Sequence, residues 1–575
     1  MRTALERYRL WAHDPYFDVA TRQELTGIAH DMGAVEERFS RSLEFGTAGL
    51  RGVIAAGTNR MNQYVVRQAT QGLAEYIASF GDEPRARGVV IAHDSRRCSP
   101  EFAREAALTL CANGIVAYMW ESLRPVPMLS YAVRKLGAVA GIVITASHNP
   151  KDYNGYKVYW EDGGQVAPER AAAIQGRIGA IGDLTAIHPM AMRDAIEAGL
   201  LRPVPESVDQ AYARDVVALA ITPLEQRAAC HVLFTPIHGA GNIPVRKVLS
   251  QAGFCVSVVP EQELPDPEFP TVRTPNPEDP SVFHLALEQA GREAPDVIMA
   301  TDPDADRLGL MARDEQGQYR HLDGNQTGAL LADFLIQSRP LPPNPAIVKS
   351  IATSNMIVPL CRESGVSLFE THTGFKYIGD IIREFEETGS HSFLLGFEES
   401  YGYLGAAFVR DKDAVMAALL VADAVAYHKA RGRTLYGALQ RIWERCGYFQ
   451  EALHNVSLPG PQGQARIDGL MERLRQNPPL ALGGIPVGCA DDYSTGTSWD
   501  FEDGVTRDLE LDTANVLHYR FVGGGFVMVR PSGTEPKLKI YFSVAGQSPE
   551  EAARKLAAVR EDTLHRMGLA QHQDP

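Results

Sequence analysis

Short apolar runs recur along this chain, and each is followed by a loop and then by a segment with helical periodicity. The runs are Val89–Ala92, Ala140–Thr145, Val232–Thr235, Val297–Ala300 and Phe393–Gly396. Such runs lack polar alternation, which is typical of strands buried on both faces of a sheet. Their alternation with helices predicts α/β layers with mainly parallel sheets. The loops that follow the strands should therefore meet at one sheet edge, where ligands bind.

The chain is too long for one hydrophobic core. Its 575 residues, at a soft average of ~150 residues per domain, predict roughly four domains with a ligand site between them. Proline-rich stretches at 264–280, 340–345 and 459–464 predict connections. The last part has alternating strand patterns around the 523–525 glycine turn and a helical pattern over 549–567. It predicts a smaller α+β domain.

Charge and cysteine content exclude several classes of protein. The formal net charge of −15 argues against nucleic acid or an anionic membrane as partner, because both need an extensive cationic face. Seven scattered cysteines without a Cys-x-x-Cys pair predict reduced, structural thiols. We find neither a signal-peptide pattern nor the ~20 consecutive apolar residues needed to cross a bilayer. We expect a cytoplasmic protein, and the sequence predicts no particular oligomeric state.

The first candidate site is the serine loop in GIVITASHNPKDYNGYK. It would place Ser147 at an exposed strand end, beside His148 and Asn149, with Lys157 ten residues further on. A serine hydroxyl is a weak nucleophile unless a base, a cation or a metal activates it. Ser147 is therefore either an activated nucleophile or a turn residue that caps a helix. Lys157 is either a solvated surface lysine or a proton carrier, whose pKa neighbouring cations would depress.

The second candidate site is the loop in DVIMATDPDADRLG, with Asp302, Asp304 and Asp306 at alternate positions. Three hard oxygen ligands so close together suit Mg²⁺. A calcium-binding EF-hand starting at Asp302 is excluded, because Arg307 and Arg313 stand where it needs Gly and Glu. A phosphatase of the haloacid-dehalogenase type also has Asp-x-Asp after a strand, but it would leave the serine loop unexplained.

Two further loops have patterns of ligand recognition. RPSGTEPKLK combines Arg530 with hydroxyls, a glycine turn and lysines, the donors that a phosphate dianion needs, although a polar turn between strands looks similar. GFEESYG places Glu398 and Ser400 after a strand, where a carboxylate and a hydroxyl can bind adjacent sugar hydroxyls or be ordinary surface groups. The segment TGFK (373–376) precedes this loop and Lys412 follows it.

Together these loops resemble the motifs of the α-D-phosphohexomutase superfamily, in that family's order. SHNP with NGYK is similar to its active-serine loop, RPSGT to its phosphate loop, and DPDADR to its metal loop DGDGDR, with Pro303 and Ala305 replacing two glycines. FGTAGLRG is similar to the opening motif, which brings Arg51 into the cleft. GFEESYG resembles the sugar loop of a subgroup with bacterial α-phosphoglucomutases and phosphopentomutase-like enzymes. HDSRRCSP (93–100) and TPIHGAGN around His238 are also family-like, and we assign both to the fold.

The resemblance implies a fold and a set of site residues. It implies three related α/β domains with mixed sheets (1–205, 206–325 and 326–445) and a smaller C-terminal α+β domain (446–575) around a central cleft. Each domain would contribute one of the loops. The implied catalytic residues are Ser147, His148, Lys157, Arg51 and Arg307; the implied metal ligands are Ser147, Asp302, Asp304 and Asp306; and the implied substrate-binding residues are Thr373, Gly374, Lys376, Glu398, Ser400, Lys412, Arg530, Ser532, Gly533, Thr534 and Lys539.

The resemblance also implies an activity. A Mg²⁺-dependent phosphoglucomutase would interconvert α-D-glucose 1-phosphate and glucose 6-phosphate through a phosphoserine at Ser147, with glucose 1,6-bisphosphate as intermediate and activator. The last domain would close on the ligand to exclude water. Phosphopentomutase and phosphomannomutase are alternatives within the family, and a metal-dependent sugar phosphatase is the alternative of another class. A non-catalytic sensor would lack the serine or the aspartates, and all are present. We expect a sugar phosphate as partner, and neither nucleic acid nor a membrane.

Overall fold

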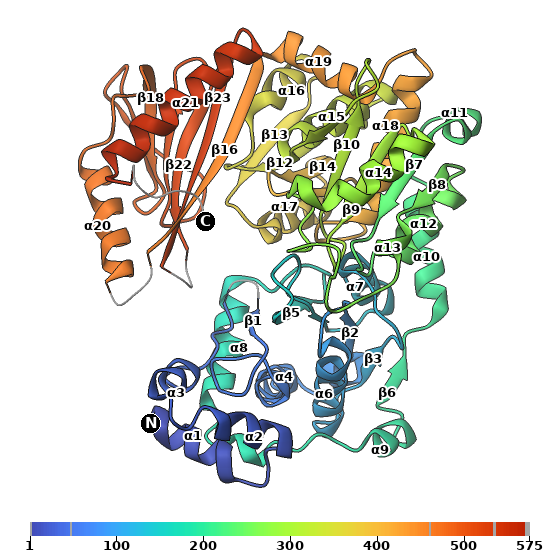
Figure 1. Cartoon of the computed structure of the whole chain (residues 1–575), viewed down its shortest axis with the longest axis vertical. Coiled ribbons are helices and arrows are strands. Elements are labelled where there is room, and N and C mark those ends of the chain that lie inside the picture. Colours follow the sequence, from blue (N-terminus) through green and yellow to red (C-terminus); the bar gives the residue numbers. More distant parts are fainter. Residues whose placement is uncertain (1–2, 47–48, 459–461, 533–535, 570–575) are drawn as a thin grey trace.

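The computed structural model describes residues 3–46, 49–458, 462–532 and 536–569. Four sheets follow one another along these residues, with six, five, four and eight strands. Figure 1 shows the N-terminal part at the bottom, the two middle parts above it and the C-terminal part at the upper left. Among the described residues, no helix has both the length and the apolarity that crossing a membrane requires.

The first sheet has the order β1-β5-β4-β2-β3-β6. Strands β4, β2, β3 and β6 pair in parallel, while β5 pairs antiparallel with both β1 and β4. Every residue of β2 and β4 is buried, which explains their unbroken apolar sequences. The strands are β1 (Leu50–Val53), β2 (Val89–His93), β3 (Ala117–Met119), β4 (Ala140–Ile144), β5 (Tyr153–Trp160) and β6 (Leu201–Pro203); the helices are α1 (Ala4–His13), α2 (Val19–Gly27), α3 (Met32–Phe39), α4 (Gln63–Ala78), α5 (Asp82–Arg87), α6 (Ser99–Ala112), α7 (Val126–Leu136), α8 (Pro168–Ala180) and α9 (Met192–Glu197).

The second sheet, β11-β10-β9-β7-β8, and the third, β13-β12-β14-β15, each have a parallel centre and an antiparallel edge. The second contains β7 (His231–Thr235), β8 (Cys255–Val258), β9 (Val297–Thr301), β10 (Leu308–Arg313) and β11 (Tyr319–Leu322), with α10 (Glu206–Val217), α11 (Leu224–Ala228), α12 (Asn242–Gln251), α13 (Pro260–Glu263) and α14 (His284–Glu293). The third contains β12 (Pro345–Ser350), β13 (Ser367–Thr371), β14 (Ser392–Glu398) and β15 (Gly402–Leu404), with α15 (Gly324–Ser338), α16 (Val358–Ser364), α17 (Phe375–Thr388), α18 (Ala414–Lys429) and α19 (Leu435–Cys446).

The C-terminal sheet is antiparallel in all its strand pairs among the described residues. Two helices accompany it, as expected of an α+β domain, and the three preceding sheets are mixed, as expected for the α/β domains. The elements are β16 (Tyr448–Ser457), β17 (Ala481–Leu482), β18 (Ile485–Asp492), β19 (Thr497–Asp500), β20 (Thr506–Asp508), β21 (Leu517–Phe521), β22 (Gly525–Pro531) and β23 (Lys537–Gly546), with α20 (Gly463–Gln476) and α21 (Pro549–Arg566).

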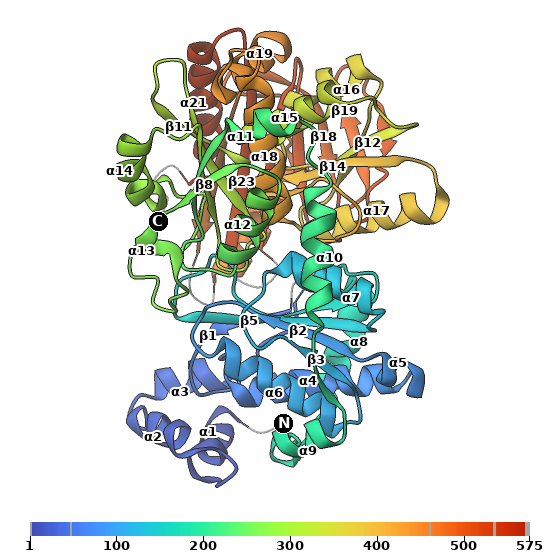
Figure 2. The ribbon, with the colours of Figure 1, turned by 90° about the vertical axis from the view of Figure 1, so that its right-hand side faces the viewer.

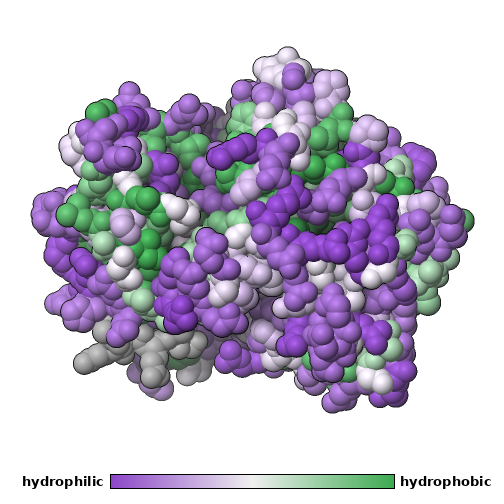
Figure 3. Space-filling view, turned by 90° about the horizontal axis from the view of Figure 1, so that it is seen from above, coloured by the Kyte–Doolittle hydropathy of each residue, from purple (hydrophilic) through white to green (hydrophobic). Residues whose placement is uncertain are grey.

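We propose domain boundaries after residues 205, 325 and 445, because each sheet lies wholly within one of the four resulting ranges. The second boundary falls in the first turn of α15, so it is the least sharp of the three. In Figure 2, α10 leads from the lower domain to the upper part of the molecule. The face seen in Figure 3 is mostly hydrophilic, with smaller hydrophobic areas between the polar ones.

One hydrophobic cluster runs through the first three domains and reaches the start of the fourth, while the first and fourth domains also have clusters of their own. The shared cluster extends from Val90 in β2 to Phe449 in β16. The C-terminal sheet has its own cluster around Val527 and Ile540. A small cluster that includes Ile351 and Tyr541 joins this sheet to the third domain. The closure of the last domain on a ligand stays a prediction.

Helix α4 packs closely on α8 because Gly72 has no side chain. A Cβ at this position would lie 2.4 Å from Ile178 Cγ1 and 2.8 Å from the backbone nitrogen of Ile178. We expect Gly72→Ala to lower the melting temperature measured by calorimetry, at a cost of ~1–3 kcal/mol for overpacking.

Gly176→Ala is the matched control, since Gly176 lies in α8 and a Cβ there would meet no described atom within 4 Å. Alanine should stabilise that helix by up to ~1 kcal/mol. A Gly72→Ala protein as stable as the wild type would contradict this account of the packing.

Candidate functional site

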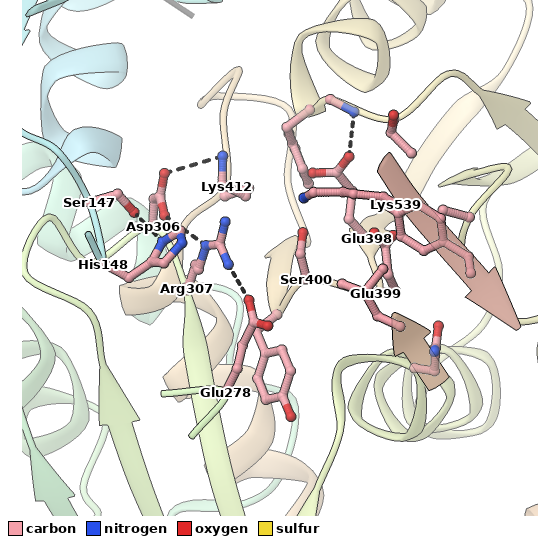
Figure 4. A pocket seen from close by; sticks show the side chains of 18 of the residues that line it. Ser147, His148, Glu278, Asp306, Arg307, Glu398, Glu399, Ser400, Lys412 and Lys539 are labelled. Atoms are coloured by element: carbon pink, nitrogen blue, oxygen red, sulfur yellow. Dashed lines mark hydrogen bonds and ion pairs between the residues drawn. The ribbon is translucent and has the colours of Figure 1, made fainter. Parts of the chain in front are cut away.

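A cavity of about 700 Å³ lies where loops of all four domains meet. Figure 4 shows side chains from different domains facing one another across it. The sequence-predicted residues that line it are Arg51, Ser147, His148, Lys157, Asp306, Arg307, Thr373, Gly374, Lys376, Glu398, Ser400, Lys412, Arg530 and Lys539. The structure therefore brings most of the separately predicted loops to one place.

Ser147 follows β4 and is almost fully buried, with its backbone in the left-handed region at φ 51°. Its hydroxyl donates a hydrogen bond to Asp302 Oδ2 at 2.6 Å and lies 3.1 Å from His148 Nδ1. The backbone nitrogen of Ser147 donates to Thr145 Oγ1 at 2.8 Å. An unfavourable backbone conformation, held by several contacts, is a feature that often accompanies function.

Arg96 holds the backbone of the serine loop in place. Its buried guanidinium donates hydrogen bonds to the backbone carbonyls of Ser147, Asn149, Pro150 and Tyr153. The assignment of HDSRRCSP to the fold agrees with these contacts. This segment shapes the loop that carries the serine.

Asp302, Asp304 and Asp306 follow β9 and are fully or almost fully buried. One carboxylate oxygen from each lies within 4.8 Å of the others, so the three could hold a metal ion. Asp304 Oδ1 and Asp306 Oδ1 have no hydrogen-bond partner among the described residues. Burial, and then repulsion by Asp304 and Asp306, raises the pKa of Asp302 well above its usual value. A divalent cation would relieve both the repulsion and the missing contacts.

One residue of this loop has a backbone conformation that favours glycine. Ala305 adopts φ 47°, a conformation that costs a non-glycine residue roughly 1–2 kcal/mol. The neighbouring TPIHGAGN segment packs against it, since the Ala240 nitrogen donates to the Pro303 carbonyl at 2.8 Å. His238 has partners for both ring nitrogens, at Leu264 O and Thr271 Oγ1, as expected for a loop histidine that is not a ligand.

Two lysines offset part of the negative charge of the aspartate cluster. Lys157 Nζ lies 3.0 Å from Asp304 Oδ2 and 3.6 Å from Asp306 Oδ2, and Lys412 Nζ lies 3.2 Å from Asp306 Oδ2. The expectation of a depressed Lys157 pKa is wrong. Burial does disfavour the charged ammonium, but attraction by Asp304 and Asp306 outweighs it and raises the pKa. Lys412 and Arg51 supply the cations expected to flank Lys157, yet the carboxylates have the larger effect on its pKa.

His148 differs from the lysines in its charge. Burial, followed by repulsion from Arg307 and Arg51, lowers its pKa well below the usual value. The imidazole is therefore neutral near pH 7 and can accept a proton. Its Nδ1 lies 3.1 Å from Ser147 Oγ, and Figure 4 shows the two side chains beside each other.

The GFEESYG loop carries two carboxylates rather than one. Glu398 Oε1 accepts a hydrogen bond from the Gly374 nitrogen at 2.6 Å, and Glu399 Oε2 accepts one from Ser350 Oγ at 3.1 Å. Burial, with repulsion from Glu399, raises the pKa of Glu398 to about 7. The contact with Gly374 joins the TGFK segment to the loop that carries Glu398. Residues of both segments line the cavity.

The C-terminal loop is only partly described. Arg530 and Lys539 line the cavity, but Ser532 does not, and the Ser532 nitrogen donates to the Lys537 carbonyl at 2.8 Å. The predicted residues Gly533 and Thr534 lie outside the described residues. Burial, followed by repulsion from Arg530, lowers the pKa of Lys539.

Several cavity residues were missed from the sequence. Glu278 forms an ion pair with Arg307 and lines the cavity with Asn276, although their proline-rich stretch had suggested only a connection. Glu399 also lines the cavity; its position next to Glu398 was the available signal. Asp411, next to Lys412, accepts a hydrogen bond from Tyr159 Oη at 2.7 Å. Nothing in the local sequence indicates such contacts between distant segments.

Family models match four successive segments of the chain. They describe the phosphoglucomutase/phosphomannomutase alpha/beta/alpha domain I at residues 42–184, domain II at 210–317, domain III at 323–446 and the C-terminal domain at 492–562. Similar curated proteins include a phosphoglucomutase of Staphylococcus epidermidis, 37% identical over 522 residues, which cover 91% of this chain and 94% of that protein. A phosphoglucomutase of Staphylococcus aureus (strain MRSA252) is 35% identical over 526 residues, 91% of this chain and 93% of that protein.

Solved structures show the same fold at lower identity. A putative phosphomannomutase from Thermus thermophilus has a TM-score of 0.68 at 23% identity, over 92% of this chain and 99% of that chain. The open form of the Paramecium phosphoglucomutase pp63/parafusin has a TM-score of 0.69 at 19% identity, over 93% and 97%. Both agree with the arrangement of four sheets.

The aspartate cluster predicts a metal-binding phenotype. Asp304→Asn removes one charged candidate ligand. We therefore expect the affinity for Mg²⁺, measured by titration calorimetry, to fall at least ~10-fold. Even residues that only contact a metal ligand typically change metal affinity by about 10–100-fold. The melting temperature without added metal should change little, because the substitution also removes repulsion between buried carboxylates.

Asp333→Asn is the control. Asp333 is also a buried aspartate, but it lies in α15 and its carboxylate accepts from Gln337 Nε2. This variant should bind Mg²⁺ as the wild type does. Unchanged Mg²⁺ affinity in Asp304→Asn would exclude the cluster as the metal site.

Proposed function

The chain belongs to the phosphoglucomutase/phosphomannomutase family, and from that premise we propose that it interconverts α-D-glucose 1-phosphate and glucose 6-phosphate. Ser147 carries the phosphoryl group and glucose 1,6-bisphosphate is the intermediate and activator. The observation that carries this proposal is the Ser147 hydroxyl, hydrogen-bonded to one of three clustered aspartates at a cavity rich in cations.

Asp302, Asp304 and Asp306 are the residues that would hold Mg²⁺, with an oxygen of Ser147 or of its phosphoryl group. The ion would supply charge neutralisation at the transferring group. The two unpartnered carboxylate oxygens and the hard oxygen donor set fit this metal.

The protein groups around Ser147 can move the protons that phosphoryl transfer requires. In the forward step the bond from phosphorus to Ser147 Oγ breaks and a bond to the sugar hydroxyl oxygen forms. Lys157, held charged by its carboxylate neighbours, can donate a proton to the leaving serine oxygen. Neutral His148 can accept the proton of the attacking hydroxyl, and Arg307 and Arg51 add positive charge beside the phosphoryl group.

A second cluster of cations suits the phosphate that does not react. Lys376, Lys539 and Arg530 line the cavity, and Figure 4 shows Lys539 beside Glu398 and away from Ser147. Burial lowers the pKa of Lys376, and repulsion from Arg530 lowers it further. Attraction to Asp380 opposes them but does not outweigh them. The Lys376 Nζ has no hydrogen-bond partner among the described residues. A phosphate dianion would relieve the repulsion within this cluster.

Two phosphate sites on either side of a sugar loop suit a bisphosphate that turns over between transfers. Glu398 and Ser400 would bind two neighbouring hydroxyls, those at C3 and C4, with Thr373 and Gly374 beside them and Lys412 next to the aspartates. A phosphatase needs only one phosphate site, so the second cluster favours the mutase. We further propose that the C-terminal domain closes on the ligand and excludes water.

The state of Ser147 tests the first half of the proposal. The donor must be loaded before the sugar monophosphate arrives, so we expect the intact mass of the isolated protein to include one phosphate adduct. Ser147→Ala should lose the serine oxygen and this adduct together. Ser130→Ala, which changes a buried serine of α7, should keep it. An adduct that persists in Ser147→Ala would move the nucleophile elsewhere, with Asp302 the first candidate.

Initial rates test the sugar. Glucose 1-phosphate should have a kcat/KM roughly ten- to a hundredfold above that of mannose 1-phosphate or ribose 1-phosphate, because one lost hydrogen bond typically costs ~1–3 kcal/mol. The rates should be measured with Mg²⁺ and the corresponding bisphosphate present. Glucose and mannose have the same configuration at C3 and C4, so contacts with those hydroxyls cannot distinguish them. The expected preference for glucose over mannose therefore rests on the similar proteins named phosphoglucomutase. A higher kcat/KM for either competitor would make the chain a phosphomannomutase or a phosphopentomutase instead.

A further inference from the structure

Glu278 is one of the acidic cavity residues to which the site described above gives no role. It lies on the proline-rich segment before α14, is half-buried, and forms an ion pair with Arg307 Nη1. Figure 4 shows it reaching toward the guanidinium from the side opposite His148. An isolated carboxylate on this wall would repel a phosphate dianion, so its presence needs a physical reason.

The backbone around Glu278 is held in place for this contact. The Glu278 nitrogen donates to Asn276 Oδ1 at 3.2 Å, and the Asp279 nitrogen donates to the Asn276 carbonyl at 3.0 Å, which closes a tight turn. The turn packs on β10 at Gly309, where a Cβ would lie 2.5 Å from the Pro277 carbonyl oxygen. The missing side chain at Gly309, two residues after Arg307, therefore lets the turn reach the arginine.

Arg307 is thus anchored at both ends. Its backbone nitrogen donates to Asp302 Oδ1 at 3.1 Å, and its guanidinium pairs with Glu278. Between these anchors the side chain is largely buried, with 17% of its surface exposed. A long arginine side chain loses considerable rotamer freedom when it is fixed, and here the fold fixes it before the ligand arrives.

On the premise of the proposed function, we propose that Glu278 is a positioning residue for phosphoryl transfer, which orients Arg307 toward the phosphoryl group on Ser147. Glu278 touches neither the reacting oxygen nor the aspartate cluster in the contacts described, and it acts through Arg307. It also offsets the positive charge of Arg307, so removing it should not weaken the binding of an anionic substrate.

The test is a double-mutant cycle of Glu278→Gln and Arg307→Lys, assayed with glucose 1-phosphate, Mg²⁺ and glucose 1,6-bisphosphate. Glutamine keeps the size of Glu278 but loses its charge. We expect kcat to fall about tenfold in Glu278→Gln, the equivalent of ~1.4 kcal/mol, with KM unchanged or lower. In the Arg307→Lys background, Glu278→Gln should cause no further loss, because the group it positions is absent.

Glu105→Gln is the matched control. It removes the carboxylate from the Arg67–Glu105 ion pair, whose side chains are 15% and 19% exposed and do not line the cavity. This control should retain the wild-type kcat. Melting temperatures of all variants separate a loss of folded protein from a loss of turnover.

Two outcomes would overturn the role of Glu278 while leaving the proposed function intact. They are a wild-type kcat in Glu278→Gln, or an equal loss in the wild-type and Arg307→Lys backgrounds, which would show that Glu278 acts independently of the arginine. A wild-type protein that does not interconvert the two glucose phosphates would instead contradict the proposed function, and the positioning role with it.

Discussion

The hydrogen bond from Ser147 Oγ to Asp302 Oδ2 joins the first domain to the second, and most of the site depends on it. It places a hydroxyl from the end of β4 within 2.6 Å of a carboxylate from the end of β9. Neither loop is complete alone: the serine lacks an activating charge, and the aspartates are a buried cluster of like charges. Brought together with Lys157 and Lys412, whose two positive charges offset part of the charge of the three carboxylates, they form a group that can accept a divalent cation and a phosphoryl group.

Because the two loops come from different domains, those domains must be packed firmly against each other. A continuous hydrophobic core through the first three domains keeps the two loops in register. The Tyr159 and Gln165 side chains of the first domain donate to Asp411 of the third at 2.7 and 2.8 Å, and Asp411 in turn accepts from Lys412. The C-terminal domain has a core of its own and contributes mainly cations to the cavity. Ser147 and the aspartates thus lie on the jointly packed part, and Arg530 and Lys539 lie on the C-terminal domain.

The sequence predicted the fold class and the loops, because each has a local signature of a buried strand followed by polar residues. Strands such as β2 and β9 were recognisable since all their residues are buried. Contacts between distant segments had no such signature. The pairing of Glu278 with Arg307 joins a proline-rich turn to a strand start, and Arg96 binds carbonyls more than fifty residues away. The sign of the Lys157 pKa shift also depended on the folded arrangement, because carboxylates and cations both surround this lysine and only the structure shows that the carboxylates have the larger effect.

The central claim is that Ser147 passes its phosphoryl group to a sugar and takes another back. The most direct measurement is a single turnover of protein carrying a ³²P-labelled phosphoserine, mixed with unlabelled glucose 1-phosphate and Mg²⁺. The account predicts that label leaves the protein for glucose 1,6-bisphosphate and then appears in glucose 6-phosphate. Label released directly as inorganic phosphate, at the rate at which it leaves the protein, would contradict the account and assign the chain to the sugar phosphatases.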